Sequence, residues 1–176
     1  MNLSPAHAGL FFWQPHIRMS YSWAVPTWLF RRLFNLWGPF RCAGIVVTHL
    51  TPDWRYARVE LRQRVFNRNY VGTHFGGSLF AMTDPFYMLL LFHNLGPRYF
   101  VWDKTGAIDY VAPGRGTVHA EFRLTEPLIE DIKREAESGQ AVRPEFDLVV
   151  SDANGGVVAR VHKQLYVRLK PKHRRS

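Results

Sequence analysis

Apolar and polar residues alternate along several short segments of the chain, a pattern typical of strands with one buried face. In residues 54–65, Ala57, Val59 and Leu61 share one face, and charged side chains occupy the other. The segments that alternate in this way, or are rich in β-branched and apolar residues, are 45–48, 54–65, 104–111, 117–124, 146–150 and 157–169. The pattern therefore predicts about six antiparallel strands.

Residues 76–94 are apolar on all sides, which is typical of a buried helix. A sheet with one apolar face must cover that face with another element. We therefore expect an α+β domain in which the sheet wraps around one long central helix. Pro85 denies a backbone amide to the Ala81 carbonyl, so a kink is expected there. Asp84, Pro85 and His93 interrupt the apolar run too early for a membrane span.

Residues 27–37 are predicted to form an amphipathic helix, with Thr27 as its N-cap. Its apolar side is expected to contain Phe30, Leu33, Phe34 and Trp37, and its polar side Arg31, Arg32 and Asn35. This helix either packs on the domain, touches a membrane surface or covers a binding tunnel. Residues 127–138 are predicted to form a second, charged helix that Gly139 ends.

Length and composition fit one folded domain. The chain has 176 residues, of which 47% are hydrophobic, and Cys42 is the only cysteine. Its single cysteine excludes an internal disulfide and a cysteine-based metal cluster, and it is consistent with a reducing cytoplasm. We expect an N-terminal extension over 1–39, a domain over 40–169 and a solvated basic tail over 170–176. The first residues lack the basic segment of a secretory signal.

The net charge of +9 favours anionic partners. The sequence has no nucleic-acid recognition motif, so no nucleic-acid partner is expected. A phosphorylated small molecule or an acidic membrane face fits the charge better. Residues 27–37 are the candidate for a weak contact with a membrane surface.

Residues 69–84 carry the candidate chemistry. They contain Asn69, the pair Gly76-Gly77, and Asp84 eight residues after the first glycine. Glycine at a helix start lets a substrate approach the free N–H groups of the first turn closely. Such amides stabilise a negatively charged oxygen. A carboxylate at Asp84 is suited to act as a general base or as a nucleophile.

This pattern resembles the hotdog-fold thioesterases of the phenylacetate-pathway type, which open the central helix with His-Gly-Gly and place an acid two turns further in. The wider spelling is similar to an uncharacterised hotdog family that is usually assigned to the thioesterases. The stretches that carry this likeness are Gly-Thr-His-Phe-Gly-Gly-Ser-Leu-Phe at 72–80, Asp-Pro-Phe-Tyr at 84–87 and Trp-Asp-Lys at 102–104. The resemblance covers roughly residues 40–169.

The resemblance implies a hotdog fold and hydrolysis of an acyl-CoA thioester without a metal or an organic cofactor. Gly76 matches the oxyanion-hole glycine of the family, Asp84 its catalytic acid and Asn69 an asparagine near the site. The other candidates are His74 for catalysis and Phe75, Gly77 and Lys104 for substrate binding. Cations that could contact the phosphates of coenzyme A are Arg115, Arg160, Lys163 and Arg168. The apolar central helix favours a medium or long acyl chain.

Helix geometry separates the two main candidates. Gly76 and Asp84 would lie roughly 12 Å apart along one helix, whereas both must reach the same reacting group. Two antiparallel central helices across a dimer axis bring Gly76 of one subunit to Asp84 of the other. The resemblance also implies sites at a dimer interface. We therefore expect a homodimer or a dimer of dimers.

Each candidate has a structural alternative. Asp84 and Pro85 fit a helix start, with Asp84 as the N-cap. Gly76 and Gly77 could serve close packing of helices, Asn69 could be a turn residue, and a histidine near a helix start is often structural. The exposed ion pair is the corresponding alternative for Lys104.

The chain departs from the family pattern at two places. Phe75 stands where the family has the histidine directly before Gly-Gly, and Pro85 and Met88 stand where some relatives have a hydroxyl. Hotdog dehydratases carry His-Phe-Pro-Gly and a helical glutamate, but Gly76 replaces that proline and Met88 that glutamate. Dehydration therefore ranks below thioester hydrolysis, and a non-catalytic acyl- or lipid-binding module is the other alternative.

Overall fold

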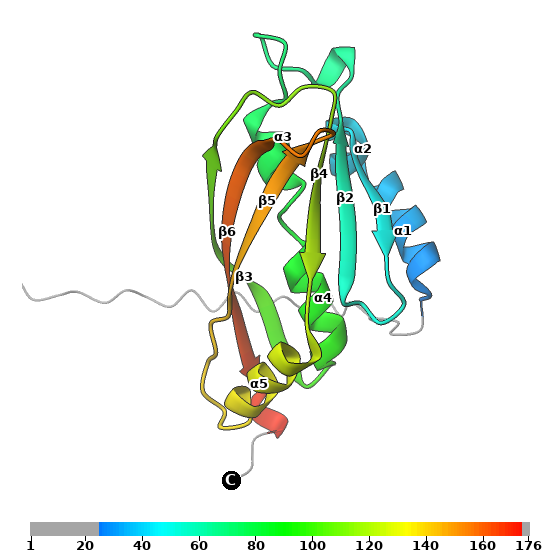
Figure 1. The fold of residues 1–176 in the computed structure, drawn as a ribbon. Helices are drawn as coiled ribbons and strands as arrows, with labels where there is room; N and C mark the ends of the chain where they lie inside the picture. Colours follow the sequence, from blue (N-terminus) through cyan, green and yellow to red (C-terminus); the bar gives the residue numbers. More distant parts are fainter. Residues whose placement is uncertain (1–24, 174–176) are drawn as a thin grey trace, which may run out of the picture.

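The computed structural model describes residues 25–173 and places all six strands in one antiparallel sheet (Figure 1). The strands are β1 (Ile45–Leu50), β2 (Tyr56–Arg62), β3 (Tyr99–Tyr110), β4 (Thr117–Arg123), β5 (Glu145–Asp152) and β6 (Val157–Leu169). Their order in the sheet is β1-β2-β4-β5-β6-β3, so β1 and β3 form its edges. The six predicted strands are confirmed, and β3 begins five residues earlier than expected, at Tyr99.

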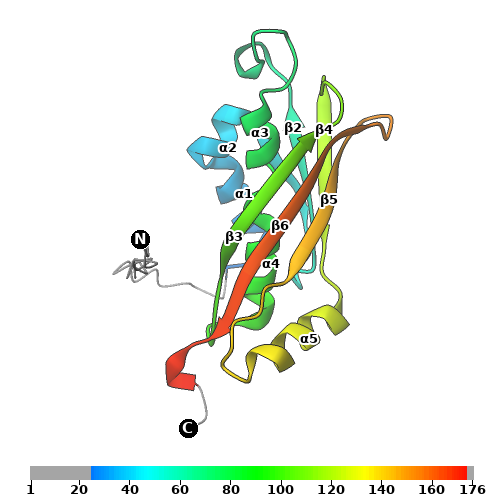
Figure 2. The same cartoon turned by 90° about the vertical axis from the view of Figure 1, so that its left-hand side faces the viewer.

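Two helices, α3 (Gly76–Ala81) and α4 (Phe86–Leu95), lie against the concave face of this curved sheet (Figures 1 and 2). Their side chains join the inward residues of the strands in one core. Helix α5 (Glu126–Ala136), which the sequence predicts over 127–138, covers one end of the sheet. The remaining helices are α1 (Thr27–Leu36) and α2 (Gly38–Ala43), with short 3-10 turns at Val65–Asn67 and Pro171–His173. The α+β hotdog architecture is confirmed.

The central helix is broken rather than kinked. Helix α3 ends at Ala81, a turn covers residues 82–85, and α4 begins at Phe86 with Pro85 as its N-cap. The break falls where Pro85 removes a backbone donor. The expectation of one continuous helix over 76–94 is therefore wrong in this detail. Asp84 lies in the turn between the two helices.

The core follows the alternation of the strands. Ala57, Val59 and Leu61 of β2 are fully buried, and the inward residues of β4 and β6 behave in the same way. The Phe122 ring of β4 packs against the ring of Phe86 at 4.9 Å between centroids. The apolar face of the sheet is thereby covered by α4, which explains why this helix is apolar all round.

Helix α1 packs beside β1 with only part of the face that its apolar residues predict, since Phe30 and Phe34 pack against the core. Asn35 faces the strand, where its Nδ2 donates to the Val47 carbonyl at 3.1 Å and its Oδ1 accepts from the Val47 amide at 2.7 Å. Arg31 donates to the carbonyl of Thr48, the next residue of β1. Polar side chains satisfy the free backbone groups of an edge strand. The prediction that placed Arg31 and Asn35 on the outer face is therefore wrong.

The outer face of α1 consequently carries apolar residues. Leu33 and Trp37, which were expected on the inner side, are exposed together with Trp28 and Leu36. Thr27 is the first helical residue and Pro26 the N-cap, which corrects the predicted cap. An exposed apolar face beside arginines is what the predicted membrane-surface contact requires, and that contact stays a prediction. Within residues 25–173, no helix has the length and apolar character to cross a membrane. The expectations for residues 1–24 and 174–176 lie outside the described residues.

Gly44 ends α2 and turns the chain into β1 with φ +83°. A Cβ at this position would overlap the Asn67 amide, which donates to the Ala43 and Arg62 carbonyls. We expect Gly44→Ala to lower the free energy of unfolding by about 2–4 kcal/mol, through left-handed strain and the broken hydrogen bonds. Urea unfolding measures this loss.

The control is Gly155→Ala. Gly155 has almost the same φ, +84°, and open space where the Cβ would stand. This variant should lose only the cost of the left-handed backbone, about 1–2 kcal/mol. Equal losses in the two variants would contradict the role given to Asn67.

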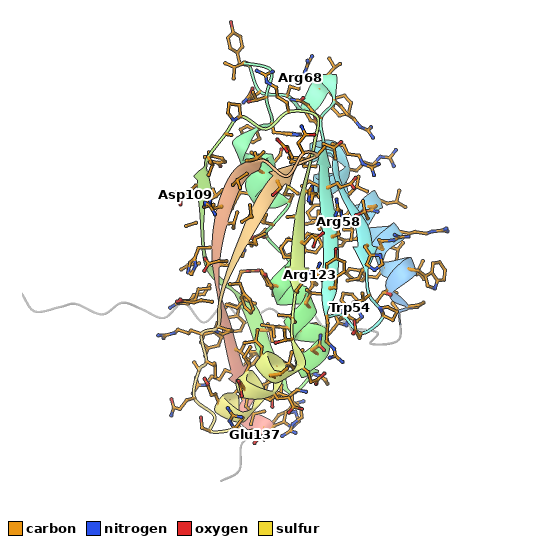
Figure 3. All side chains as sticks on the ribbon, in the orientation of Figure 1. Trp54, Arg58, Arg68, Asp109, Arg123 and Glu137 are labelled. Carbon is orange, nitrogen blue, oxygen red and sulfur yellow. The ribbon has the colours of Figure 1, made fainter. Side chains whose placement is uncertain are left out.

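His93 of α4 stacks on Trp54, which Figure 3 labels beside the start of β2, with 3.5 Å between ring centroids. Burial lowers the pKa of His93 from its ordinary value of 6.5 to about 4. The neutral ring is therefore favoured in the folded state, and its contribution to stability is complete above pH 6.5. We expect about 2 kcal/mol to be lost as the pH falls from 6.5 to 4, because solvent screens part of the effect at this half-buried ring.

Urea unfolding at a series of pH values measures this loss. His93→Phe keeps an aromatic ring on Trp54 but has no titrating group, so its stability should depend less on pH between 4 and 6.5. Identical pH profiles for the variant and the wild type would contradict the assignment.

Candidate functional site

A cavity of about 560 Å³ lies at the start of α3. Its walls are the loop over residues 69–77, Leu79 and the segment 110–114, which begins at the last residue of β3. Most of the candidate residues line it: Asn69, His74, Phe75, Gly76 and Gly77. The structure therefore gathers five of the seven sequence-predicted site residues around one opening, without Asp84 or Lys104.

The first turn of α3 presents backbone amides to this cavity. Phe75 is the N-cap in an extended conformation, and its carbonyl accepts from the amides of Ser78 and Leu79. The amides of Gly76 and Gly77 precede these and have no intrahelical acceptor, as in any first helical turn. Both amides belong to residues of the cavity wall. The local arrangement is therefore suited to receive a negatively charged oxygen.

The two glycines do not serve contact between helices. A Cβ on Gly76 would lie 2.9 Å from the Tyr110 hydroxyl, and a Cβ on Gly77 would overlap the Phe75 ring. Both neighbours are side chains of the cavity itself. The alternative of helix-on-helix packing is therefore wrong, and the glycines keep the cavity floor open.

Tyr110 is a site residue that the sequence did not single out. Its side chain is exposed, and its hydroxyl stands over Gly76 at the mouth of the cavity. The sequence pattern of residues 104–111 predicted only that Tyr110 shares a strand face with Ile108. A tyrosine at the end of an edge strand, followed by Pro113-Gly114, was the available signal.

Asn69 holds the loop that leads to α3. Its Nδ2 donates to the Thr73 hydroxyl at 2.8 Å and to the His74 carbonyl at 3.1 Å, and its Oδ1 accepts from the Thr73 amide at 2.9 Å. These contacts are those of a turn residue. Asn69 lines the cavity, but its side-chain groups are already used by the loop, so they support the structural alternative over a direct role with substrate.

His74 is 3% exposed, and its Nε2 lies 3.0 Å from the Gly116 carbonyl. An acceptor at this distance requires Nε2 to carry the proton, which leaves Nδ1 as an unpartnered acceptor in the described part of the chain. Burial lowers the pKa of His74, and the Gly116 contact opposes this shift only in part. A neutral, anchored ring ties the α3 loop to the start of β4, which supports the structural alternative over catalysis.

The predicted substrate-binding residues divide into two groups. Phe75 is exposed and lies over Gly77, so both belong to the cavity wall. Lys104 is exposed on β3 at a bulge, where Asp103 pairs with Leu165 and Thr105 with Gln164. The bulge leaves Lys104 as the extra residue. Lys104 does not line the cavity of its own chain.

Asp84 lies apart from the cavity and contacts a buried lysine. Its Oδ1 accepts from Nζ of Lys163 at 2.8 Å, and its side chain is 56% exposed. Lys163 also lies 2.9 Å from Oδ1 of Asp103. Asp84 is not the N-cap of α4, since Pro85 occupies that position. The cap alternative is therefore wrong, and the carboxylate is partly free to meet a substrate.

Lys163 corrects a further expectation. It was one of four candidates for a phosphate contact, but it is 1% exposed and points into the protein. The strand alternation explains this position, because Lys163 follows Val161 and precedes Leu165 on the inward side of β6. Of the other candidates, Arg115 contacts the loop that leads to α3, where it donates to the Gly72 carbonyl at 3.3 Å.

The six-stranded antiparallel sheet around α3 and α4 defines a hotdog domain, with a cavity at the Gly-Gly start of α3. Three solved structures share this fold. The first is PA5026 from Pseudomonas aeruginosa, a protein of unknown function described as a probable thioesterase, with 24% identity and a TM-score of 0.75 over 83% of this chain and 97% of that one. The second is the thioesterase HI1161 from Haemophilus influenzae, with 12% identity and a TM-score of 0.59 over 83% of this chain and 92% of that one. The third is the PaaI protein of the Escherichia coli phenylacetic acid degradation operon, with 14% identity and a TM-score of 0.55 over 79% of this chain and 89% of that one.

The chain belongs to the family described as a domain of unknown function, DUF4442, whose model matches residues 26–167. No curated protein matches the chain. The likeness to solved structures confirms the expected hotdog fold, and the description of the family assigns no activity.

Proposed function

We propose that the protein hydrolyses an acyl-CoA thioester at the cavity beside α3. The observation that carries this proposal is the pair of free amides at Gly76 and Gly77 in the wall of an open cavity of about 560 Å³. The Gly76 amide would donate to the carbonyl oxygen as it becomes negative. The segment 110–113 and Leu79 would contact the acyl chain through their apolar atoms.

Asp84 would supply the reactive carboxylate. As a general base it takes a proton from water while the water oxygen attacks the carbonyl carbon. The tetrahedral intermediate then collapses with cleavage of the C–S bond, and the thiolate takes up a proton to leave as coenzyme A. As a nucleophile, the carboxylate would instead attack the carbonyl carbon itself and expel the coenzyme A thiolate, which takes up a proton; water would then hydrolyse the resulting mixed anhydride to the free acid and the Asp84 carboxylate. Both routes need the same oxyanion donor.

Two copies of the chain would build each site. Within one chain, Asp84 contacts Lys163 and does not line the cavity at Gly76. Strand β3 is a long edge strand with exposed Phe100, Trp102 and Tyr110, and such edges pair with other strands. Antiparallel pairing of two β3 strands would place Tyr110 of one copy near the middle of the other, where Asp103 faces Lys163 and Asp84. A homodimer, or a dimer of such dimers, follows from this proposal.

The phosphates of coenzyme A would lie at the rim of the cavity. Arg115 reaches the loop at Gly72 from outside, and its guanidinium retains further donors. In the paired arrangement, the exposed Lys104 at the β3 bulge is a second cation for this role. No metal and no organic cofactor enter this mechanism.

The test is hydrolysis of an acyl-CoA panel from two to sixteen or so carbons, with release of free thiol as the signal. We expect turnover that rises with chain length to a medium or long acyl group. Protein that retains acyl-CoA but releases no thiol from any member would favour the non-catalytic acyl-binding alternative. Dehydration of a 3-hydroxyacyl-CoA is not expected, since Met88 stands where a dehydratase carries its acid and His74 is anchored to Gly116.

A further inference from the structure

Lys163 is a charged residue at a core position of β6. Its side chain is 1% exposed, whereas the inward residues on either side of it, Val161 and Leu165, are apolar. Removing an ammonium group from water costs several kcal/mol unless close partners compensate it. A protein that needed only packing here would carry another apolar residue. Packing of the core alone therefore does not explain a lysine at this position.

The partners of Lys163 come from three separate elements. Nζ donates to Asp84 from the α3–α4 turn at 2.8 Å and lies 2.9 Å from Asp103 of β3. It also stands 5.6 Å from the centre of the Phe80 ring of α3. The contact to Asp103 is an ion pair without hydrogen-bond geometry. Lys163 thus joins the helix break to the edge strand.

The absence of a side chain at Gly106 leaves space for the Lys163 side chain. It is the residue that pairs with Lys163 across β3 and β6. A Cβ on Gly106 would lie 2.8 Å from the Phe80 ring and 3.3 Å from Cδ of Lys163. The residue that pairs with Lys163 on the other side, in β5, is the apolar Phe146. The charged groups that act on the Asp103 carboxyl are Lys163 and Asp84.

We propose that Lys163 is the positioning residue of the active carboxylate: it holds one oxygen of Asp84 and thereby presents the other to the substrate. This inference rests on the proposed function of Asp84. The Asp84 side chain is more than half exposed, although one of its oxygens is fixed from the protein interior. Such an anchor fixes the direction of a carboxylate in a turn that would otherwise leave its rotamer free.

Asp103 balances the charge of the anchor. One ammonium faces two carboxylates, so Asp84 shares Lys163 with a competitor. Burial raises the pKa of Asp103, and the Lys163 ammonium opposes that shift. The Lys163 ammonium attracts the Asp84 carboxylate, and the Asp103 carboxylate repels it. The two residues therefore act on Asp84 with opposite signs.

Kinetics of two variants test the proposal. Lys163→Met, which keeps most of the apolar stem, should lower kcat about 10- to 100-fold with little change in KM. The acid limb of its kcat/KM profile should move up by about one pH unit, because Asp84 loses a neighbouring cation. Asp103→Asn should move the same limb to lower pH. Lys172→Met, which removes an exposed lysine of the C-terminal turn, is the matched control and should change neither quantity.

If Lys163 has a purely structural role, Lys163→Met lowers the stability, but the acid limb of the kcat/KM profile, measured on folded protein, stays in place. That result would overturn the proposal. If Lys163→Met does not fold, Asp103→Asn decides alone, and an unchanged acid limb overturns the proposal. Failure of the proposed function is distinguishable, because wild-type protein would then hydrolyse no acyl-CoA. In that case, NMR tests the contact between Lys163 and Asp84: the substitution Asp84→Asn must shift the ¹⁵N signal of the Lys163 ammonium.

Discussion

Asp84→Asn should lower kcat/KM for the best acyl-CoA substrate by about 100- to 10,000-fold. The amide has nearly the shape of the carboxylate, but it neither accepts a proton from water nor attacks a thioester. Lys163 keeps its ion pair with Asp103 in this variant, so the fold should persist. Thiol release under saturating and limiting substrate separates kcat from KM, and the loss should fall on kcat.

Asp131→Asn is the control for this substitution. Asp131 is exposed on α5, at the far end of the sheet from α3 (Figure 1), and pairs with Arg134 at 2.6 Å. An exposed pair of this kind contributes little, so activity and stability should stay at the wild-type level. Wild-type rates in Asp84→Asn would remove Asp84 from the mechanism and leave the fold assignment intact.

Gly76→Pro should lower kcat about 100- to 1,000-fold, the usual effect of losing one oxyanion-hole donor. Proline lacks the backbone N–H but fits the first position of a helix. Phe75, with ψ 127°, already has the extended conformation that a residue before proline prefers. The variant therefore removes the amide with little expected change in α3.

Gly76→Ala is the matched control, because it adds the same Cβ and keeps the N–H. That Cβ would meet the hydroxyl end of Tyr110, an exposed side chain that has room to move. We expect a loss of less than about tenfold. Equal losses in the alanine and proline variants would assign the effect to Tyr110 or to cavity shape and contradict the amide as donor.

The strands were predictable because the alternation of apolar and polar residues that marks a strand lies within the strand itself. Ala57, Val59 and Leu61 alternate with charged residues, and one inward face follows from that alternation alone. The break at Pro85 was indicated by the missing donor. The start of β3 at Tyr99 was not, because residues 99–103 contain no clear alternation before the bulge at Lys104.

Helix α1 shows where local reasoning fails. Its apolar spacing indicated one inner face, yet Asn35 and Arg31 turn inward to satisfy the backbone of β1. An edge strand has free donors and acceptors that no helical wheel contains. The orientation of α1 is thus set by a partner that lies about ten residues or more away in sequence, and the helix pattern alone carries no record of it.

The candidate site was predictable in its residues but not in its electrostatics. Gly76 and Asp84 were assigned from a motif, and the cavity contains the first of them. Lys163 appeared as one basic residue among several. Its inward register on β6 was readable, but its partners, Asp84 and Asp103, come from segments more than fifty residues away.

In the proposed dimer, Gly76 of one subunit works with Asp84 of the partner subunit. Mixing Gly76→Pro and Asp84→Asn chains after joint unfolding and refolding tests it most directly. Random pairing makes half of the dimers mixed, and each mixed dimer has one intact site of two, so about a quarter of wild-type activity should return. If both groups acted within one chain, no intact site would form, and activity no higher than the average of the two inactive variants would contradict the claim.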